Sequence, residues 1–274
     1  MAVWEAMAPR RMLKVQRPIR WSSNLGLALL NGALVRFISP LGAVGVAILA
    51  ESFEWGLFNV VSLPNWFADL SSVILLDLAI YLQHVMFHAV PLFWRLHMVH
   101  HADLDFDVTT GLRFHTIEIL LSLGIKALAI LLLGAPAIAV LIFEVLLNAT
   151  SMFNHSNVRM PLAVDRLLRW FVVTPDMHRV HHSWHHRETN SNFGFNLPWW
   201  DRLLGTYRDQ PAEGHVGMTI GLAQFRREKH TERLHWMLLM PFISSVGEYP
   251  MNGDQPNGES GPNASLSKAS ADLN

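Results

Sequence analysis

The chain of 274 residues contains no cysteine, and only 16% of its residues are charged. The absence of cysteine excludes a disulfide framework, a cysteine-ligated iron–sulfur cluster, a thiolate haem and a zinc ribbon. Soluble domains carry about 25% charged residues, whereas 51% of this chain is hydrophobic and its mean hydropathy is +0.23. Its net charge of −1 offers no reason to expect nucleic acid as a partner. The composition therefore favours a membrane protein.

Long apolar runs predict four membrane-spanning helices. Residues 25–50 carry one charge, Arg36, and a second run covers residues 66–88. A third run, 117–153, breaks at Gly134-Ala135-Pro136 and is interpreted as a hairpin of two spans. The alternative is that the later runs are buried helices of a soluble α-helical domain, which their length and low charge disfavour.

Charge asymmetry orients these predicted spans. The first 21 residues contain five Lys or Arg residues and one Glu, whereas the connections at 51–65 and 134–136 contain no Lys or Arg. By the positive-inside rule, the N-terminus and everything after Phe153 are cytoplasmic. The segment 54–65 is too short to span and is expected at the membrane interface. The predicted organisation is a basic cytoplasmic N-terminus (1–21), a membrane domain (22–208), a C-terminal cytoplasmic segment (209–247) and a disordered tail (248–274).

The sequence contains fifteen histidines, most of them clustered. The first cluster is His84 and His88, which share one helical stripe, about 60° wide, with Asp77 and Tyr81. Two imidazoles at this spacing can bind one metal ion. Asp77 and Tyr81 are natural hydrogen-bonding partners for the other ring nitrogens. Because Asp77 lies about two turns from His84, it could instead serve a neighbouring helix.

Two further clusters repeat the pattern H-x-x-H-H. They consist of His97, His100 and His101, and of His178, His181 and His182. On a helix the three rings of each cluster converge on one side. Thr174 as N-cap and Pro175 at the first position predict where the last of these helices begins. A histidine tag would be contiguous, so this repeated spacing on one membrane face predicts metal ligation.

Other histidines extend or surround these clusters. His115 and His155, at the cytoplasmic ends of spans, are candidate additional ligands. Eight to ten imidazoles exceed the four that zinc or the six that octahedral iron can use, so two metal ions are implied. The remaining five are expected beside the ligands or at the surface (His185, His186) or as ordinary cytoplasmic residues (His215, His230, His235).

Several metal chemistries fit this pattern poorly. No H-E-x-x-H motif of a hydrolytic zinc site occurs. A ferritin-like centre needs two E-x-x-H motifs, and the one present, Glu232 to His235, lies far from the spans. A transport site belongs at the bilayer midplane, whereas these clusters lie at the membrane edge. Neutral imidazoles around two iron ions suit O2 activation next to a lipid.

The ordered histidine pattern resembles that of the fatty acid hydroxylase / sterol desaturase superfamily, in its bacterial branch. The resemblance covers about residues 22–208. It rests on Asp77-x3-Tyr81-x2-His84-x3-His88, His97-x2-His100-His101, Asn154-His155-Ser156-Asn157, Thr174-Pro175-x2-His178-x2-His181-His182, Asn192-Phe193-Gly194 and the stretch Trp200–Tyr207.

The resemblance implies an all-α, four-span membrane enzyme whose cytoplasmic helical cap holds a non-haem centre of two iron ions. Such enzymes use O2 and two electrons to hydroxylate or desaturate a lipid. By this resemblance the metal ligands are His84, His88, His97, His100, His101, His155, His178, His181 and His182. His115 stands where the family often has His-Pro, although Thr116 departs from that pattern, and Asn192 is a candidate for holding a metal-bound water.

The motifs do not identify the lipid, which could be a sterol, a fatty acyl chain or an alkyl lipid. No haem signature of a fused cytochrome b5 and no G-x-G-x-x-G nucleotide motif is present. A separate electron donor, cytochrome b5-like or ferredoxin/reductase-like, is therefore expected. In a bacterium the protein would lie in the inner membrane with its site facing the cytoplasm. Hydroxylation is favoured over desaturation, and an apolar tunnel is expected between the second, third and fourth spans. The alternative is a membrane protein that binds metal without redox chemistry.

Overall fold

The computed structural model describes residues 1–251, and that part of the chain is helical with no β-strand. Its helices are α1 (Ala2–Met7), α2 (Arg17–Ile38), α3 (Gly42–Ser52), α4 (Leu57–Val60), α5 (Asn65–Ala89), α6 (Pro91–His101), the 3-10 helix η1 (Thr110–Leu112), α7 (Thr116–Leu133), α8 (Ala137–Asn154), α9 (Leu162–Leu168), α10 (Pro175–His181), α11 (His186–Thr189), α12 (Trp199–Leu203), α13 (Gly214–Gly217), α14 (Glu228–Thr231) and α15 (Leu234–Ile243).

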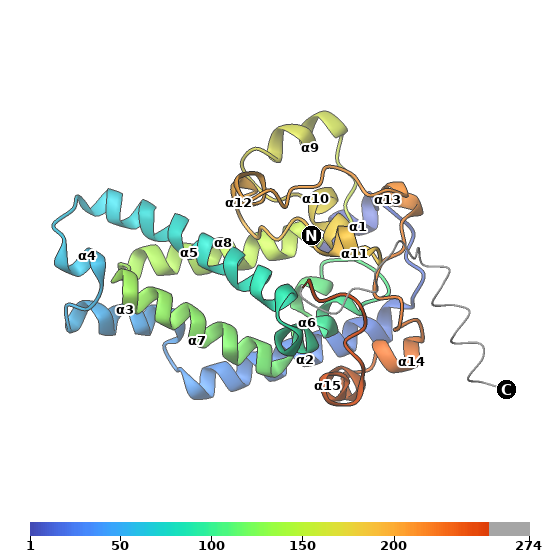
Figure 1. Cartoon of the computed structure of the whole chain (residues 1–274), viewed down its shortest axis with the longest axis horizontal. Coiled ribbons are helices and arrows are strands. Elements are labelled where there is room, and N and C mark those ends of the chain that lie inside the picture. The colour runs from blue at the N-terminus through green and yellow to red at the C-terminus, as the bar shows by residue number, and fades with distance from the viewer. Residues whose placement is uncertain (252–274) are drawn as a thin grey trace.

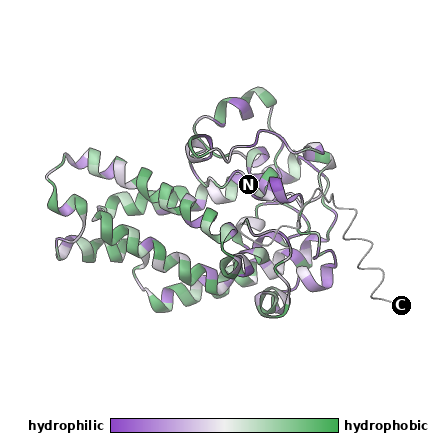
Figure 2. Cartoon of the chain, in the orientation of Figure 1, coloured by the Kyte–Doolittle hydropathy of each residue, from purple (hydrophilic) through white to green (hydrophobic). Residues whose placement is uncertain are grey.

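Four helical stretches are long and apolar enough to cross a membrane. They are residues 17–60, which comprise α2, α3 and α4, and the helices α5, α7 and α8. These helices extend to one end of the molecule, and the shorter helices form a cap at the other (Figure 1). Only 11% of the apolar window of α7 and 39% of that of α5 are buried inside the protein. Large apolar side chains of these helices are exposed, among them Leu128 and Leu132 of α7, and most residues of the long helices are hydrophobic (green in Figure 2). These features fit the predicted four-span membrane protein.

The first span is broken where the sequence predicted one continuous helix over 25–50. Helix α2 ends at Ile38 and α3 begins at Gly42. Pro40 lies in the break, and proline has no backbone N–H with which to continue a helix. Beyond the break, Ala43 and Ala47 pack in one apolar cluster with residues of α5, α7 and α8, where their small side chains permit close helix contact.

The connections far from the cap meet each other. Gly134 ends α7 in the left-handed conformation at φ 62°, so the predicted hairpin turn is confirmed. A Cβ atom on Gly56, whose φ is 94°, would lie 2.1 Å from the backbone nitrogen of Gly134. In addition, Glu51 accepts a hydrogen bond of 2.8 Å from the backbone N–H of Ala137. The segment around α4 therefore closes the same end of the bundle as the α7–α8 turn.

The cap comprises residues 1–16, 90–115 and 155–251. The basic N-terminal stretch is folded onto it, because the fully buried Arg20 pairs with Asp103 at 2.6 Å and with Asp107 at 2.5 Å. Since α2 starts at Arg17, this helix crosses the expected domain boundary at residue 22. The N-terminus and the loop after α6 thus hold the first span against the cap.

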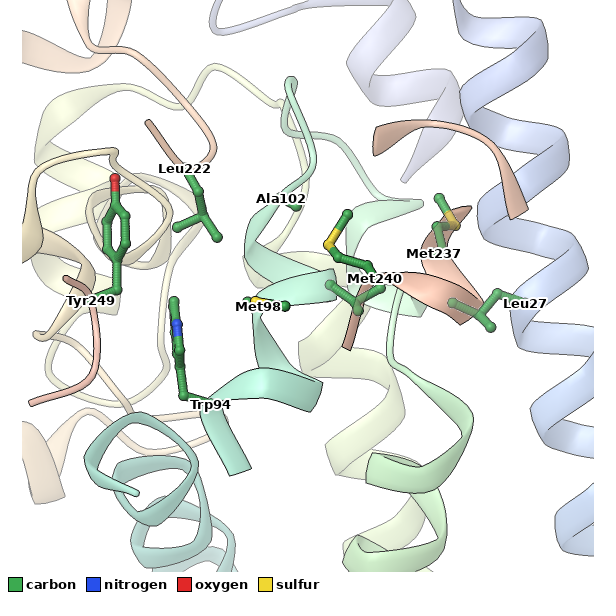
Figure 3. Close-up of a cluster of buried hydrophobic side chains, with 9 residues drawn as sticks. Leu27, Trp94, Met98, Ala102, Leu222, Met237, Met240 and Tyr249 are labelled. Atoms are coloured by element: carbon green, nitrogen blue, oxygen red, sulfur yellow. The ribbon is translucent and has the colours of Figure 1, made fainter. Parts of the chain in front are cut away.

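An apolar cluster lies behind α6 (Figure 3). Trp94, Met98 and Ala102 form one stripe of α6 and its C-cap at helical spacing, and all three are fully buried. They meet residues that lie far away in the sequence: Leu27, Leu222, Met237, Met240 and Tyr249. The predicted C-terminal segment, residues 209–247, therefore contributes to the core of the cap. One face of α6 packs into this core and the adjacent face carries the three histidines, so that the ring centroid of Trp94 lies 5.3 Å from that of His101.

The first residues of the predicted disordered tail, 248–251, belong to the described part of the chain, and two of them make hydrogen bonds to the cap and to α5. Tyr249 is 5% exposed, and its hydroxyl donates a hydrogen bond of 2.7 Å to the carbonyl of Trp184. The backbone N–H of Met251 donates to the carbonyl of His88 at 2.9 Å. The rest of the tail, 252–274, lies outside the described residues.

The close approach of the two glycine turns makes a testable prediction. In Gly56→Ala the new methyl group meets the backbone of the α7–α8 turn at a positive φ, so we expect the variant to lose about 2–3 kcal/mol of stability. Gly124→Ala is the matched control, because nothing lies within 4 Å of a Cβ at that helical position. Thermal unfolding in detergent measures both, and equal midpoints for the two variants would contradict the packing described.

Candidate metal centre

Nine buried histidines converge in two groups. One group contains His84, His88, His97, His101 and His181, and the other contains His100, His155, His178 and His182. Within each group one ligand atom per residue lies within 4.8 Å of every other. The groups adjoin, since the ring centroids of His101 and His182 are 4.6 Å apart. All nine ligands expected from the sequence are thus brought together.

Local backbone signals position these rings. Pro91 starts α6 directly after α5 ends, so the histidines of both helices meet across a tight corner. At α10, the Thr174 side chain accepts a hydrogen bond from the backbone N–H of Met177, and Pro175 is the first helical residue, which confirms the predicted helix start. His155 is the C-cap of α8, at the end of the fourth span.

Oxygen acceptors fix the orientation of five rings through Nδ1. The contacts are His84 to the carbonyl of Phe193 (2.8 Å), His88 to Oδ1 of Asn190 (3.0 Å), His97 to Oε1 of Glu118 (2.6 Å), His155 to the carbonyl of Ser151 (2.8 Å) and His181 to the carbonyl of Ser191 (2.7 Å). Because a carbonyl or carboxylate oxygen only accepts, each of these Nδ1 atoms carries the proton. The Nε2 atom of each ring therefore presents a lone pair, as a metal ligand does.

The arrangement of the inward-facing ring nitrogens shows that a cation would fit between them. Nε2 of His84 lies 3.1 Å from Nε2 of His97. Since both rings keep their proton on Nδ1, two lone pairs face each other there with no hydrogen between them. In addition, Nε2 of His181 and both nitrogens of His182 are buried without a hydrogen-bond partner in the described chain. Buried polar atoms left in this state are costly, and a metal ion bound between them would satisfy them.

The electrostatics of the cap keep these rings neutral. Burial, followed by the neighbouring imidazoles, lowers the pKa of His100, His101, His178, His181 and His182 well below 6.5. Burial also lowers the pKa of His155 to about 4. A neutral imidazole is the form that ligates metals, so the cluster is in its binding state near neutral pH.

The candidate His115 lies outside both groups. Its Nδ1 accepts a hydrogen bond from the backbone N–H of Ile117 and caps α7, and its Nε2 lies 3.3 Å from the carbonyl of Leu238. With both nitrogens engaged by the backbone, the ring joins α7 to α15. The structure therefore gives His115 a role in holding helices together rather than in binding metal.

Asp77 and Tyr81 share the predicted stripe with His84, but in the described part of the chain neither side chain forms a hydrogen bond with a histidine. The Asp77 carboxylate accepts hydrogen bonds from the backbone N–H of Leu197 at 3.2 Å and from the indole N–H of Trp200 at 2.8 Å. The Tyr81 hydroxyl lies 2.8 Å from that of Thr206. The prediction that they partner the ring nitrogens is wrong, because both side chains anchor the segment 195–207. For Asp77 this agrees with the alternative that it serves a neighbouring part of the fold.

Asn192 also has a structural role. Its side-chain amide donates to the carbonyls of Met177 and Arg208 and accepts from the backbone N–H of Arg208 at 2.8 Å. Its φ of 52° places it in the left-handed region, which asparagine tolerates better than most residues. With these contacts the amide is engaged by the backbone, so it does not reach toward a metal-bound water.

Two partners of the histidines were missed by the sequence analysis. Glu118 is 3% exposed within a membrane-spanning helix and pairs with His97, and Asn190 holds His88. The signal for Glu118 was present, because a carboxylate in an apolar span needs a partner. Asn190 carried no such signal, since its loop is placed by tertiary packing.

Of the histidines expected outside the centre, His215 is placed differently from an ordinary surface residue. It is 4% exposed, and its Nε2 lies 3.6 Å from a carboxylate oxygen of Asp176 on α10. His235 is exposed as expected. His185 lies 3.5 Å from the carboxylate of Glu213, and His186 contacts Asn190, the residue that holds His88.

A cavity of about 300 Å³ leads from the helix bundle to the histidines. Its walls come mainly from α2, α5, α7 and α8, and His84 and His97 are among its lining residues. Phe114 in its wall stacks on His100 with ring centroids 4.3 Å apart. The predicted tunnel lay between α5, α7 and α8 with apolar walls, whereas this cavity also includes α2 and has several polar side chains.

The fold and the paired histidine groups define a membrane protein with a buried two-part imidazole site. The family model of the fatty acid hydroxylases matches residues 70–206, which is half of the chain. The chain belongs to the fatty acid hydroxylase family. Its curated relatives are named as hydroxylases and monooxygenases, which are oxidoreductases.

Curated relatives share this histidine-bearing region. Ornithine lipid hydroxylase OlsE of Rhizobium tropici is 31% identical over 163 residues, covering 59% of this chain and 48% of the relative. Alkylglycerol monooxygenase of Xenopus tropicalis is 27% identical over 212 residues, covering 74% and 45%. A cholesterol 25-hydroxylase-like protein of Danio rerio is 30% identical over 220 residues, covering 74% and 82%.

The chain spans about half the length of the first two of these relatives and most of the third. No solved structure matches the chain significantly.

The two groups predict which histidines control metal content. His100→Ala and His181→Ala each remove a ring from one group, so we expect metal content to fall by at least about half in each. Glu118→Gln keeps the shape of the side chain but weakens the hydrogen bond that orients His97. Loss of such a hydrogen bond to a metal-binding histidine lowers metal affinity about 10–100-fold. The exposed His235→Ala is the control. Elemental analysis of purified protein measures all four, and equal metal content throughout would contradict the assignment.

The lowered pKa values predict that acid destabilises the metal-free protein. Below pH 6.5 histidines of the unfolded chain take up protons, while the six buried cap rings stay neutral to lower pH. The unfolded state then binds more protons than the folded state, so the free energy of unfolding falls as pH falls from about 6.5 toward 4. Thermal unfolding of chelator-treated protein should show a midpoint that declines over this range. A constant midpoint would contradict the burial of neutral rings.

Proposed function

We propose that the protein is a membrane-bound non-haem di-iron oxygenase that uses O2 and two electrons to hydroxylate a lipid. The observation that carries the proposal is the cavity between the membrane-spanning helices, because His84 and His97 of the candidate metal centre line it. A lipid entering from the bilayer side would reach the metal site without crossing water.

The composition of the two histidine groups supports iron. Zinc sites are almost always tetrahedral, whereas one group here offers five imidazoles. Sets of five and four nitrogen donors would suit six-coordinate iron, which uses more donors than a tetrahedral zinc site. Two iron ions would supply the activation of O2 for oxidation of a C–H bond. His84, His88, His97, His101 and His181 would hold one ion, and His100, His155, His178 and His182 the other.

The protein's own residues would shape the reaction in two ways. Phe87, Phe114 and Phe195 line the cavity beside the histidines and exclude water from the oxidised carbon. Glu118, Asn190 and backbone carbonyls hold the rings in a fixed orientation, so that the site changes little as charge develops.

The relatives support a lipid substrate and a hydroxylation. Their names give an ornithine lipid, an alkylglycerol and cholesterol as substrates, and all three names denote hydroxylases or monooxygenases. Because these lipids differ in shape, the names support the class of substrate and not one member. For this chain we therefore propose hydroxylation rather than desaturation.

The orientation and the electron supply are part of the proposal. The basic N-terminus folds onto the cap, so the positive-inside rule favours a cytoplasmic metal site. The electrons would come from a separate cytochrome b5-like or ferredoxin/reductase-like protein that docks on this cap.

Isotope incorporation tests the proposed reaction. Cells or vesicles with the iron-loaded protein and a reductase, supplied with isotopically labelled O2, should form a lipid that contains one labelled oxygen atom. His100→Ala should abolish this product, and His235→Ala should retain it. Stoichiometric zinc with no oxygen consumption under any electron donor would instead support metal binding without redox chemistry.

A further inference from the structure

The cavity that reaches the candidate metal centre has a polar track along one side. Gln83, Ser122, Lys126 and Glu144 all line it, and each belongs to a membrane-spanning helix. The Gln83 amide donates a hydrogen bond of 3.0 Å to the Ser122 hydroxyl, and the Lys126 ammonium pairs with Glu144 at 2.5 Å. Polar and charged side chains at membrane depth are costly and face functional interiors.

The ion pair is placed for contact with a ligand rather than for stability alone. Buried ion pairs between helices contribute little net stability, because desolvation offsets their attraction. The side chains of Lys126 and Glu144 are 13% and 27% exposed, which places them nearer to the outside of the bundle than Glu118. The pair therefore lies on the route from the bilayer to the histidines.

Unpartnered acceptor oxygens provide a second, independent observation. Oδ1 of Asn31, Oε1 of Gln83 and Oε2 of Glu118 are buried, line this cavity and have no hydrogen-bond partner within the described chain. The Asn31 residue is 6% exposed, and its amide nitrogen already donates to the carbonyl of Phe114, which leaves only the oxygen free. Three free acceptors around one cavity call for a ligand that donates hydrogen bonds.

Helix geometry gives the length of the track. Glu118, Ser122 and Lys126 follow one another at intervals of four on α7, so they share a face and span about 12 Å. Glu118 marks the metal end through its contact with His97, and Lys126 marks the outer end. Because the Lys126–Glu144 pair is neutral as a unit, a neutral donor fits the track better than a charged group, which would add net charge at membrane depth.

We propose that this polar track is a binding subsite for a hydroxyl or amide group of the substrate. The substrate is then a lipid that carries a neutral hydrogen-bond donor within about 12 Å of the carbon that is oxidised, and a plain hydrocarbon chain is a poor ligand. The inference rests on the proposed function for its reference to an oxidised carbon, but the binding preference can be measured without turnover.

Paired probes test this subsite on the full-length protein in nanodiscs. Hexadecan-1-ol and hexadecane differ only in one hydroxyl, and their dissociation constants can be compared by displacement of radiolabelled hexadecan-1-ol. We expect the alcohol to bind roughly tenfold more tightly than the alkane, as one buried hydrogen bond to a charged or polar group allows. The variant Lys126→Met/Glu144→Leu removes both charges together, and Gln83→Leu removes a free acceptor.

Each variant should lower the preference for the alcohol at least about threefold while the affinity for hexadecane changes little. If the double variant does not fold, Gln83→Leu alone provides the test. Leu128→Ala is the matched control, because Leu128 lies on the same helix, is 56% exposed and does not line the cavity. Equal affinity for the two probes in the wild type, or a preference that persists in Gln83→Leu, would overturn the subsite. Absence of lipid oxidation would refute the proposed function and leave this binding result intact.

Discussion

The convergence of nine buried imidazoles is the constraint on which the rest of the structure depends. Oxygen acceptors turn five of the rings so that their Nε2 lone pairs point inward. Facing lone pairs such as those of His84 and His97 repel each other until a cation lies between them. Folding of the cap and binding of metal are therefore coupled, since neither the orientation of the rings nor their burial is favourable without the other.

The long helices and the cap each contribute part of this histidine site. The membrane-spanning helix α5 contributes His84 and His88, α8 ends at its C-cap His155, and both helices line the cavity. The cap contributes the other rings and the supports behind them. Arg20 ties the first span to the cap through Asp103 and Asp107, and the core behind α6 turns its histidines toward the bundle (Figure 3). A cavity among the long apolar helices and a buried imidazole site thus adjoin each other at one end of the helix bundle.

The sequence predicted what depends on local pattern and composition. Helical spacing identified all three histidine clusters, Thr174 and Pro175 marked the start of α10, and Gly134 marked the hairpin. Sequence pattern did not predict the roles of residues whose partners are set by tertiary packing. Asp77 and Tyr81 share the stripe of His84, yet loop segments far along the chain satisfy them. His115 has the ligand side chain, but its position as an N-cap engages its nitrogens. Spacing cannot show that Asn190 reaches His88 across 102 positions.

The central claim is that one buried site divides its nine histidines between two metal ions. An experimental structure of the iron-loaded protein, with anomalous scattering measured at the iron edge, tests it most directly. We expect two iron peaks, one among His84, His88, His97, His101 and His181 and the other among His100, His155, His178 and His182. A single peak, or iron bound outside these two groups, would contradict it.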